Sequence, residues 1–116
     1  MNNRRVVVTG MGAVTPVGNN VEDTWQSLIN GRHGIGPITL FDTEGYKATL
    51  AGEVKNFEPR DYMDKQEILR SDRFAQLAVA AATQAVEESG VIGTLEPDRV
   101  AVYFGTGIGG VTTITR

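Results

Sequence analysis

Two glycine-rich turns, at residues 10–12 and 105–110, are the segments whose residue types and spacing could bind a phosphate group or an oxyanion. The first lacks a dinucleotide fingerprint, because Thr15 stands where the third glycine belongs and no acidic residue closes a second strand about 20 residues later. The second lacks the Gly-Lys-Ser/Thr ending of a phosphate loop. A small nucleotide-dependent enzyme is therefore disfavoured, although the backbone amides of 105–110 could still hold an oxyanion.

Side chains that commonly carry chemistry are scarce. The chain has no cysteine, which excludes a disulfide, a thiolate metal site and a cysteine nucleophile from these residues. His33 is the single histidine, so there is no His/His metal pair and no evident catalytic triad. A solvated loop histidine is the favoured interpretation of His33, and Trp25 and Phe74 are interpreted as core anchors. The residues alone form no complete catalytic constellation, and we expect no bound metal.

Lys65 and Arg70 could form part of a docking patch for an acidic partner. Acidic side chains interleave with them, at Asp61, Asp64, Glu67 and Asp72. The residues alone therefore favour an ordinary solvated face over a docking patch.

Composition places the chain among soluble globular proteins. Its 116 residues suit one domain at most, and 41% hydrophobic with 22% charged residues disfavours disorder. A net charge of -3 without a basic stripe makes a nucleic-acid partner unexpected. No apolar run approaches the roughly 20 residues that span a bilayer. We therefore expect a cytoplasmic protein with no membrane partner.

Patterning predicts strands that alternate with helices. Residues 5–9 and 100–104 read as strands buried on both faces, each ending in a glycine turn. Between and after them we expect, in order, a helix over 21–29, a mostly irregular loop over 32–47, a partly exposed strand over 49–55, a short polar helix over 61–69, a helix over 72–89 and the start of a last helix from 111. The economical topology is an α/β fold with a mainly parallel sheet flanked by helices.

The two longer helices carry recognisable ends. Asn20 is expected to cap the first and Gly31 to end it. Ser71 or Asp72 could cap the second, which Gly90 ends. Alanines at 75, 78, 80, 81, 82 and 85 make nearly every side of that second helix small. We expect a central, well-buried helix that other backbone segments approach closely.

Four motifs, in order along the chain, resemble the amino-terminal part of type II β-ketoacyl-acyl carrier protein synthases. They are Val-Val-Val-Thr-Gly-Met-Gly-Ala-Val-Thr-Pro-Val-Gly at 6–18, Gly34-Ile35 with Phe41-Asp42, Ala-Gly-Glu-Val at 51–54, and Gly-Thr-Gly-Ile-Gly-Gly at 105–110. The resemblance implies a partial thiolase-like fold, part of an αβαβα layered sandwich, in an enzyme that works as a homodimer. Residues 1–116 are then the amino-terminal portion of a ketoacyl synthase domain, incomplete at its carboxyl end.

In that family a cysteine takes an acyl group from acyl carrier protein, and two histidines assist decarboxylation of malonyl-acyl carrier protein. The resulting carbanion attacks the acyl thioester and extends the chain by two carbons, with no cofactor. The family's cysteine and histidines lie beyond its Gly-Thr-Gly-Ile-Gly-Gly segment, and His33 is not one of them. The resemblance therefore implies that this chain alone has no catalytic residue and is inactive.

Three positions carry over from the family. Ile108 matches the residue that borders the acyl-chain pocket near the dimer interface and helps to gate its length. Lys65 and Arg70 match positions in the basic patch that receives acyl carrier protein, although Gln66 and Leu69 stand where further basic residues are common. The resemblance therefore raises the odds of a docking patch, in a weakened form.

Two functional hypotheses remain beside the disfavoured nucleotide enzyme. The first is the amino-terminal portion of a condensing enzyme of fatty-acid or polyketide synthesis. The second is a noncatalytic module that binds acyl carrier protein or a full-length synthase, which requires the chain to fold alone. Each ~100 Å² of bare apolar surface forfeits about 2.5 kcal/mol, against a domain stability of roughly 5–15 kcal/mol. We therefore expect the isolated chain to be unstable or dependent on partner segments.

Overall fold

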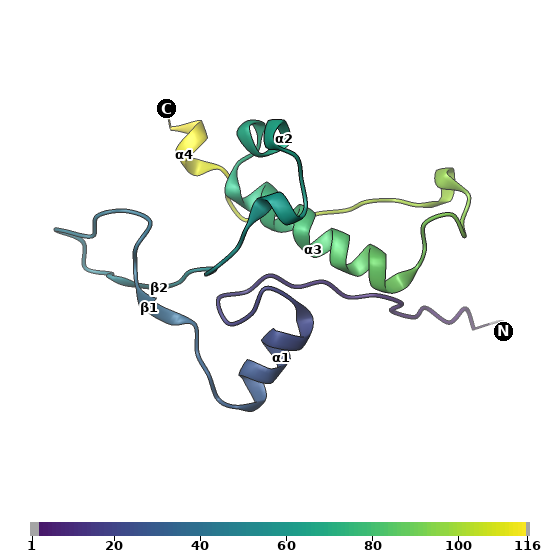
Figure 1. The fold of residues 1–116 in the computed structure, drawn as a ribbon, viewed down its shortest axis with the longest axis horizontal. Coiled ribbons are helices and arrows are strands. Elements are labelled where there is room, and N and C mark those ends of the chain that lie inside the picture. Colours follow the sequence, from purple (N-terminus) through teal and green to yellow (C-terminus); the bar gives the residue numbers. More distant parts are fainter. Residues whose placement is uncertain (1–2, 116) are drawn as a thin grey trace. The chain divides into compact units, whose positions relative to one another are not determined.

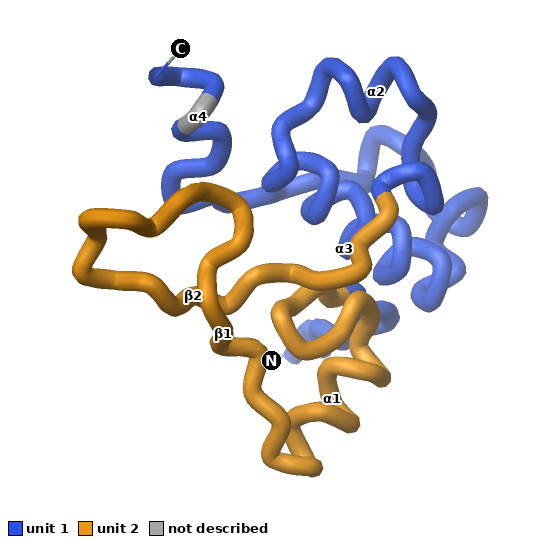
Figure 2. Tube along the Cα trace, turned by 60° about the vertical axis from the view of Figure 1, so that its left-hand side comes forward, with its two compact units in different colours: residues 1–12, 59–116 blue, residues 13–58 orange. Residues whose placement is uncertain are grey.

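The computed structural model describes residues 3–115, except for the side chain of Thr112. It contains four α-helices, two short strands and two 3₁₀ turns among those residues (Figure 1). They follow the order α1 (Val21–Ile29), β1 (Ile35–Pro37), β2 (Leu50–Gly52), η1 (Pro59–Asp61), α2 (Lys65–Arg70), α3 (Arg73–Ser89), η2 (Pro97–Arg99) and α4 (Val111–Ile114). The chain divides into two compact units, of which unit 2 is Ala13–Glu58 and unit 1 joins Met1–Gly12 to Pro59–Arg116 (Figure 2).

Helix α1 of unit 2 begins and ends where its sequence predicts. The side chain of Asn20 accepts a hydrogen bond from the amide of Asp23 at 2.8 Å, which confirms the expected N-cap. The helix ends at Ile29, and Gly31 follows with a φ of 66°, a left-handed conformation that glycine adopts without strain. Trp25 is 57% exposed, so its interpretation as a core anchor is wrong for this structure.

The sheet of unit 2 is a two-stranded antiparallel hairpin. Strand β1 pairs with β2 in the register Ile35 to Gly52, Gly36 to Ala51 and Pro37 to Leu50. Strand β2 confirms the first part of the predicted strand 49–55, whereas residues 53–55 lie outside any strand. Strand β1 corrects the expectation that 32–47 is mostly loop. The next residue, Ile38, donates its amide to the Thr49 carbonyl at 3.0 Å and prolongs the pairing. Because hydrogen-bonded pairs alternate with non-bonded pairs in an antiparallel ladder, Pro37 opposite Leu50 lies at a position that needs no amide donor.

The carboxylate of Glu53 accepts hydrogen bonds from the residues that follow β1. Glu53 accepts hydrogen bonds from the Thr39 hydroxyl at 2.8 Å, the Thr39 amide at 3.0 Å and the Leu40 amide at 3.3 Å. The hydroxyl bond and then the amide bonds hold the pKa of Glu53 below its ordinary value, with a smaller contribution from Lys55. The ionised carboxylate therefore stabilises this turn of the hairpin.

This clamp predicts a pH dependence confined to the hairpin. Because the folded pKa is lowered, the stabilisation is complete above the unfolded value of about 4.5 and is lost as pH falls through the lower folded value. The Thr39 amide resonance, followed by NMR, should titrate with a midpoint below 4.5. Glu53→Gln should abolish that titration, whereas the control Glu44→Gln should leave it in place. A midpoint at or above 4.5 would contradict the clamp.

Helix α3 organises unit 1. It spans Arg73–Ser89 and ends at Gly90 with a left-handed φ of 59°, as the sequence predicts. Residues 10–12 run along one side of it, where a Cβ on Gly10 would lie 2.1 Å from the carbonyl oxygen of Ala85 and one on Gly12 would lie 1.8 Å from that of Ala81. The Glu88 carboxylate accepts the amide of Met11 at the same contact. The expected close approach of backbone to an alanine-rich helix is confirmed.

The burial expected for α3 is wrong for this structure. Ala80 is the one hydrophobic side chain that is fully buried among the described residues, and Phe74 is 42% exposed. An apolar groove of about 670 Å³ opens along α3 in unit 1. Its lining side chains include Phe74, Val79, Val86, Val102 and Phe104. The helix therefore has apolar faces without cover.

The predicted strands 5–9 and 100–104 differ from the structure. Neither range forms a strand, and both are exposed: Val6 by 95% and Tyr103 by 97%. A strand forms only when hydrogen-bonded to a neighbour, and none of the described residues of unit 1 provides one. The two observed strands are antiparallel, so the mainly parallel sheet stays a prediction.

Helix α2 begins later than expected. Instead of a helix over 61–69, the structure has the 3₁₀ turn η1 and then α2. Asp64 and Glu67 form a capping box: the Asp64 carboxylate accepts the Gln66 and Glu67 amides at 2.7 and 2.9 Å, and the Glu67 carboxylate accepts the Asp64 amide at 2.9 Å. These reciprocal bonds fix the first turn at Lys65. The helix from Val111 is confirmed as α4.

Candidate functional site

The glycine loop, residues 105–110, leads into α4 in unit 1. The amide of Gly109 donates to the Thr106 hydroxyl at 3.0 Å, and Gly110 has a left-handed φ of 78° at the helix start. Ile108 lies immediately before these two glycines and is 78% exposed. The loop therefore exposes the branched apolar side chain of Ile108, and the hydrogen bond between Gly109 and Thr106 stabilises the loop backbone beside it.

The beginning of α3 lies against this loop. A Cβ on Gly109 would lie 2.5 Å from the ring of Phe74, and one on Gly110 would lie 2.5 Å from a carboxylate oxygen of Asp72. The hydroxyl of Thr113 donates to the other oxygen of Asp72 at 2.6 Å. The Phe74 ring therefore excludes a Cβ at position 109, and at position 110 the left-handed φ favours glycine whatever the space.

Asp72 has a different role from the one its position suggests. It is the N-cap residue of α3, which agrees with one of the two predicted caps, yet its side chain makes no capping hydrogen bond. Its carboxylate contacts Thr113 instead. Thr113 could not be found from the sequence, since no local pattern joins residues that lie 41 positions apart.

Lys65 and Arg70 are the first and last residues of α2. Both are exposed, and neither side chain makes a hydrogen bond or ion pair with any residue between 3 and 115. The interleaved carboxylates of Asp64 and Glu67 are engaged in the capping box, and that of Asp72 accepts Thr113. Three of the four acids that argued against a docking patch are therefore committed to local hydrogen bonds, while the two cations remain available.

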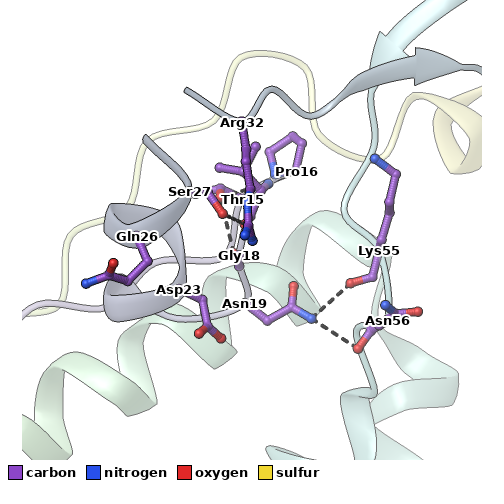
Figure 3. Close-up of a pocket in the computed structure, with 11 residues that line it drawn as sticks. Thr15, Pro16, Gly18, Asn19, Asp23, Gln26, Ser27, Arg32, Lys55 and Asn56 are labelled. Atoms are coloured by element: carbon purple, nitrogen blue, oxygen red, sulfur yellow. Dashed lines mark hydrogen bonds between the residues drawn. The ribbon is translucent and has the colours of Figure 1, made fainter. Parts of the chain in front are cut away.

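A polar pocket of about 390 Å³ lies within unit 2 (Figure 3). The Asn19 amide donates to the carbonyls of Lys55 and Asn56 at 2.9 and 3.0 Å, and the buried Ser27 hydroxyl donates to the Val17 carbonyl at 2.8 Å. Both side chains donate to backbone carbonyls, so their hydrogen bonds stabilise the local backbone of unit 2. We assign this pocket no chemical role.

Two further findings concern sites of other kinds. His33 is exposed, and no cluster of three or more His, Cys, Asp or Glu side chains that could hold a metal ion occurs in the described range 3–115. In that same range no helix has both the length and the apolar character needed to cross a bilayer.

The chain belongs to the β-ketoacyl synthases: residues 3–115 match the family described as "Beta-ketoacyl synthase, N-terminal domain". The resemblance found in the sequence is thereby confirmed. Among curated relatives, the chain is similar to 3-oxoacyl-[acyl-carrier-protein] synthase 2 of Staphylococcus aureus strain COL, with 49% identity over 112 residues. The protein of the same name from Synechocystis sp. is 47% identical over 112 residues. Each match covers 96% of this chain and 27% of the relative, so the chain spans about a quarter of their length.

A solved structure supports the same assignment. The ishigamide ketosynthase/chain length factor superposes with a TM-score of 0.70 and 42% sequence identity, over 82% of this chain and 23% of that one. The chain therefore has part of a ketosynthase-like α/β fold.

Proposed function

We propose that this chain supplies the amino-terminal portion, residues 1–116, of a 3-oxoacyl-acyl carrier protein synthase that elongates acyl chains in fatty acid biosynthesis. The observation that carries the proposal is the 49% identity to such a synthase over 96% of the chain. In the reaction, a thiolate attacks the acyl thioester and expels the carrier thiol. Malonyl-acyl carrier protein then loses CO₂, and its carbanion displaces that thiolate as the new C–C bond forms.

None of these residues provides the sulfur, because the chain has no cysteine. The contribution of the chain is therefore structural and selective: it presents the glycine loop, Ile108 and the cations of α2. A mainly parallel sheet within an αβαβα sandwich, a homodimer and a cytoplasmic location belong to the same proposal. The exposed apolar segments 5–9 and 100–104 support the sheet, since they have the composition of buried strands.

Ile108 is proposed to line the pocket that receives the acyl chain of the thioester substrate. Its exposure leaves room for a substrate chain to contact it, and the adjacent glycines allow the loop backbone to lie close to α3. A branched apolar side chain in this position can limit the length of an apolar ligand by volume alone.

The test is a chimera in which this chain replaces the matching segment of the Staphylococcus aureus synthase. The chimera should condense acyl-acyl carrier protein with malonyl-acyl carrier protein. Ile108→Phe in the chimera should lower kcat/KM for hexadecanoyl primers roughly tenfold or more while sparing hexanoyl primers, because overpacking costs about 1–3 kcal/mol. Ile108→Val is the matched control and should retain long primers. A soluble, dimeric but inactive chimera would reject the proposed function, and an unchanged length profile would remove Ile108 from the pocket.

Lys65 and Arg70 are proposed to receive the acidic acyl carrier protein. Lys65→Glu combined with Arg70→Glu in the chimera should raise KM for carrier-bound substrates roughly tenfold, because like charges then face each other at the docking surface. KM for small thioester analogues should stay unchanged, and the effect should shrink at high salt. Lys47→Glu with Arg99→Glu makes the same change in net charge and should have little effect. Equal loss with carrier-bound and small substrates would contradict docking and indicate a folding defect.

A further inference from the structure

Asp72 uses its carboxylate in a way that is unusual for an N-cap residue. An aspartate in this position ordinarily accepts amides of the first helical turn, as Asp64 does at the start of α2. In α3 that bond is absent, and the amides of Ala75 and Gln76 bond only to the Asp72 backbone carbonyl, at 3.0 and 3.1 Å. The carboxylate is therefore free to bond outside its own helix.

That carboxylate connects α3 to the residues that follow the glycine loop. One oxygen accepts the Thr113 hydroxyl at 2.6 Å, in the range of charge-assisted O–H···O bonds. The other lies where a Cβ on Gly110 would come within 2.5 Å. Phe74 occupies the corresponding space beside Gly109. The loop backbone thus lies against Phe74 of α3 and the N-cap residue Asp72, and the Thr113 bond holds it on its carboxyl side.

Ile108 depends on this arrangement for its position. Its side chain is 78% exposed, so surrounding packing does little to fix it. The backbone of the next two residues carries the contacts with α3. Whatever fixes Gly109 and Gly110 therefore fixes the direction in which Ile108 projects.

We propose that Asp72 is a positioning residue for Ile108: by accepting the Thr113 hydroxyl, it holds the glycine loop in the conformation that presents Ile108 to the acyl chain. The specificity part of this inference rests on the proposed function, in which Ile108 lines the acyl pocket. The substrate class concerned is the acyl thioester, and the property that Asp72 controls is the preferred acyl length.

The positioning part is tested by amide hydrogen exchange in the chimera, where the chain has the rest of the synthase to fold against. Asp72→Ala removes the acceptor, Thr113→Val removes the donor at similar volume, and Asp72→Asn keeps an acceptor oxygen. Asp72→Ala and Thr113→Val should each speed exchange at the Gly109 amide roughly tenfold, the double variant should add little, and Asp72→Asn should restore most of the protection. Exchange at Ala75 should not change with Thr113→Val.

Other results would overturn the positioning role. If Asp72→Ala speeds exchange along the first turn of α3 and Thr113→Val changes nothing, Asp72 is a helix cap and no more. If the unmodified chimera shows no slowed exchange at Gly109, the anchored loop itself is rejected.

The specificity part is tested in the chimera. Asp72→Ala and Thr113→Val should each change the ratio of kcat/KM for hexadecanoyl and hexanoyl primers several-fold, and KM for malonyl-acyl carrier protein should stay constant. Asp72→Asn should restore the original ratio. If the variants change exchange at Gly109 but not the ratio of kcat/KM for the two primers, the proposed role of Ile108 is overturned and the anchored loop remains. If they change that ratio but not the exchange, the positioning role of Asp72 is overturned.

Discussion

Gly12→Ala is expected to destabilise unit 1 by about 3 kcal/mol, a large part of the roughly 5–15 kcal/mol that holds a typical domain together. The added Cβ would lie 1.8 Å from the Ala81 carbonyl oxygen and 2.8 Å from its carbonyl carbon. Both atoms belong to the backbone of α3, which cannot move aside without losing its own hydrogen bonds. The segment 10–12 must therefore leave the helix.

Urea unfolding of the chimera followed by circular dichroism, together with amide exchange at Met11, measures this loss. Gly107→Ala is the matched control within unit 1, because nothing lies within 4 Å of its added Cβ and no positive φ is involved. It should change stability by less than about 1 kcal/mol. Equal unfolding midpoints for the two variants would contradict the observed contact between Gly12 and α3.

The purified chain is expected to show no condensation of malonyl and acyl thioesters, whereas the chimera that carries it should turn over. The cause is chemical, since the family resemblance requires a cysteine thiolate and the chain has no cysteine. The measurement uses radiolabelled malonyl-acyl carrier protein. The chain is purified by an affinity step that removes the synthases of the host cell. Labelled 3-oxoacyl product formed by the chain alone would overturn the assignment of its residues to a noncatalytic role.

The elements that sequence predicts best are those whose signals are local. Asn20 and Gly31 bracket α1, and Gly90 ends α3, because capping and left-handed glycine act within a few residues. Strand β1 escaped prediction since Gly36 and Pro37 are typical of loops, and its partner β2 lies in another part of the sequence. The Asp-x-x-Glu spacing of Asp64 and Glu67 is the local signal that marks the start of α2 at Lys65.

The strands expected at 5–9 and 100–104 show the limit of composition. Their residues specify a buried environment, and a strand additionally needs hydrogen-bonding neighbours that none of the described residues provides. In the candidate site, too, some residues could be predicted from the sequence and others could not. The family motif indicated Ile108, Lys65 and Arg70, and the structure shows where each lies. The bond from Thr113 to Asp72 arises from folding alone, because no periodicity relates the two residues.

Unit 1 is assembled from two segments of the chain, 1–12 and 59–116, which unit 2 separates in the sequence. The amide of Met11 and its acceptor Glu88 are 77 positions apart, so this contact closes a long loop and is slow to form. During translation the three valines at 6–8 leave the ribosome well before α3 exists to receive the adjoining glycines. At a rate of about 5–20 residues per second, Gly10 and Gly12 wait several seconds for the helix that they contact, and the valines stay exposed even after it has formed.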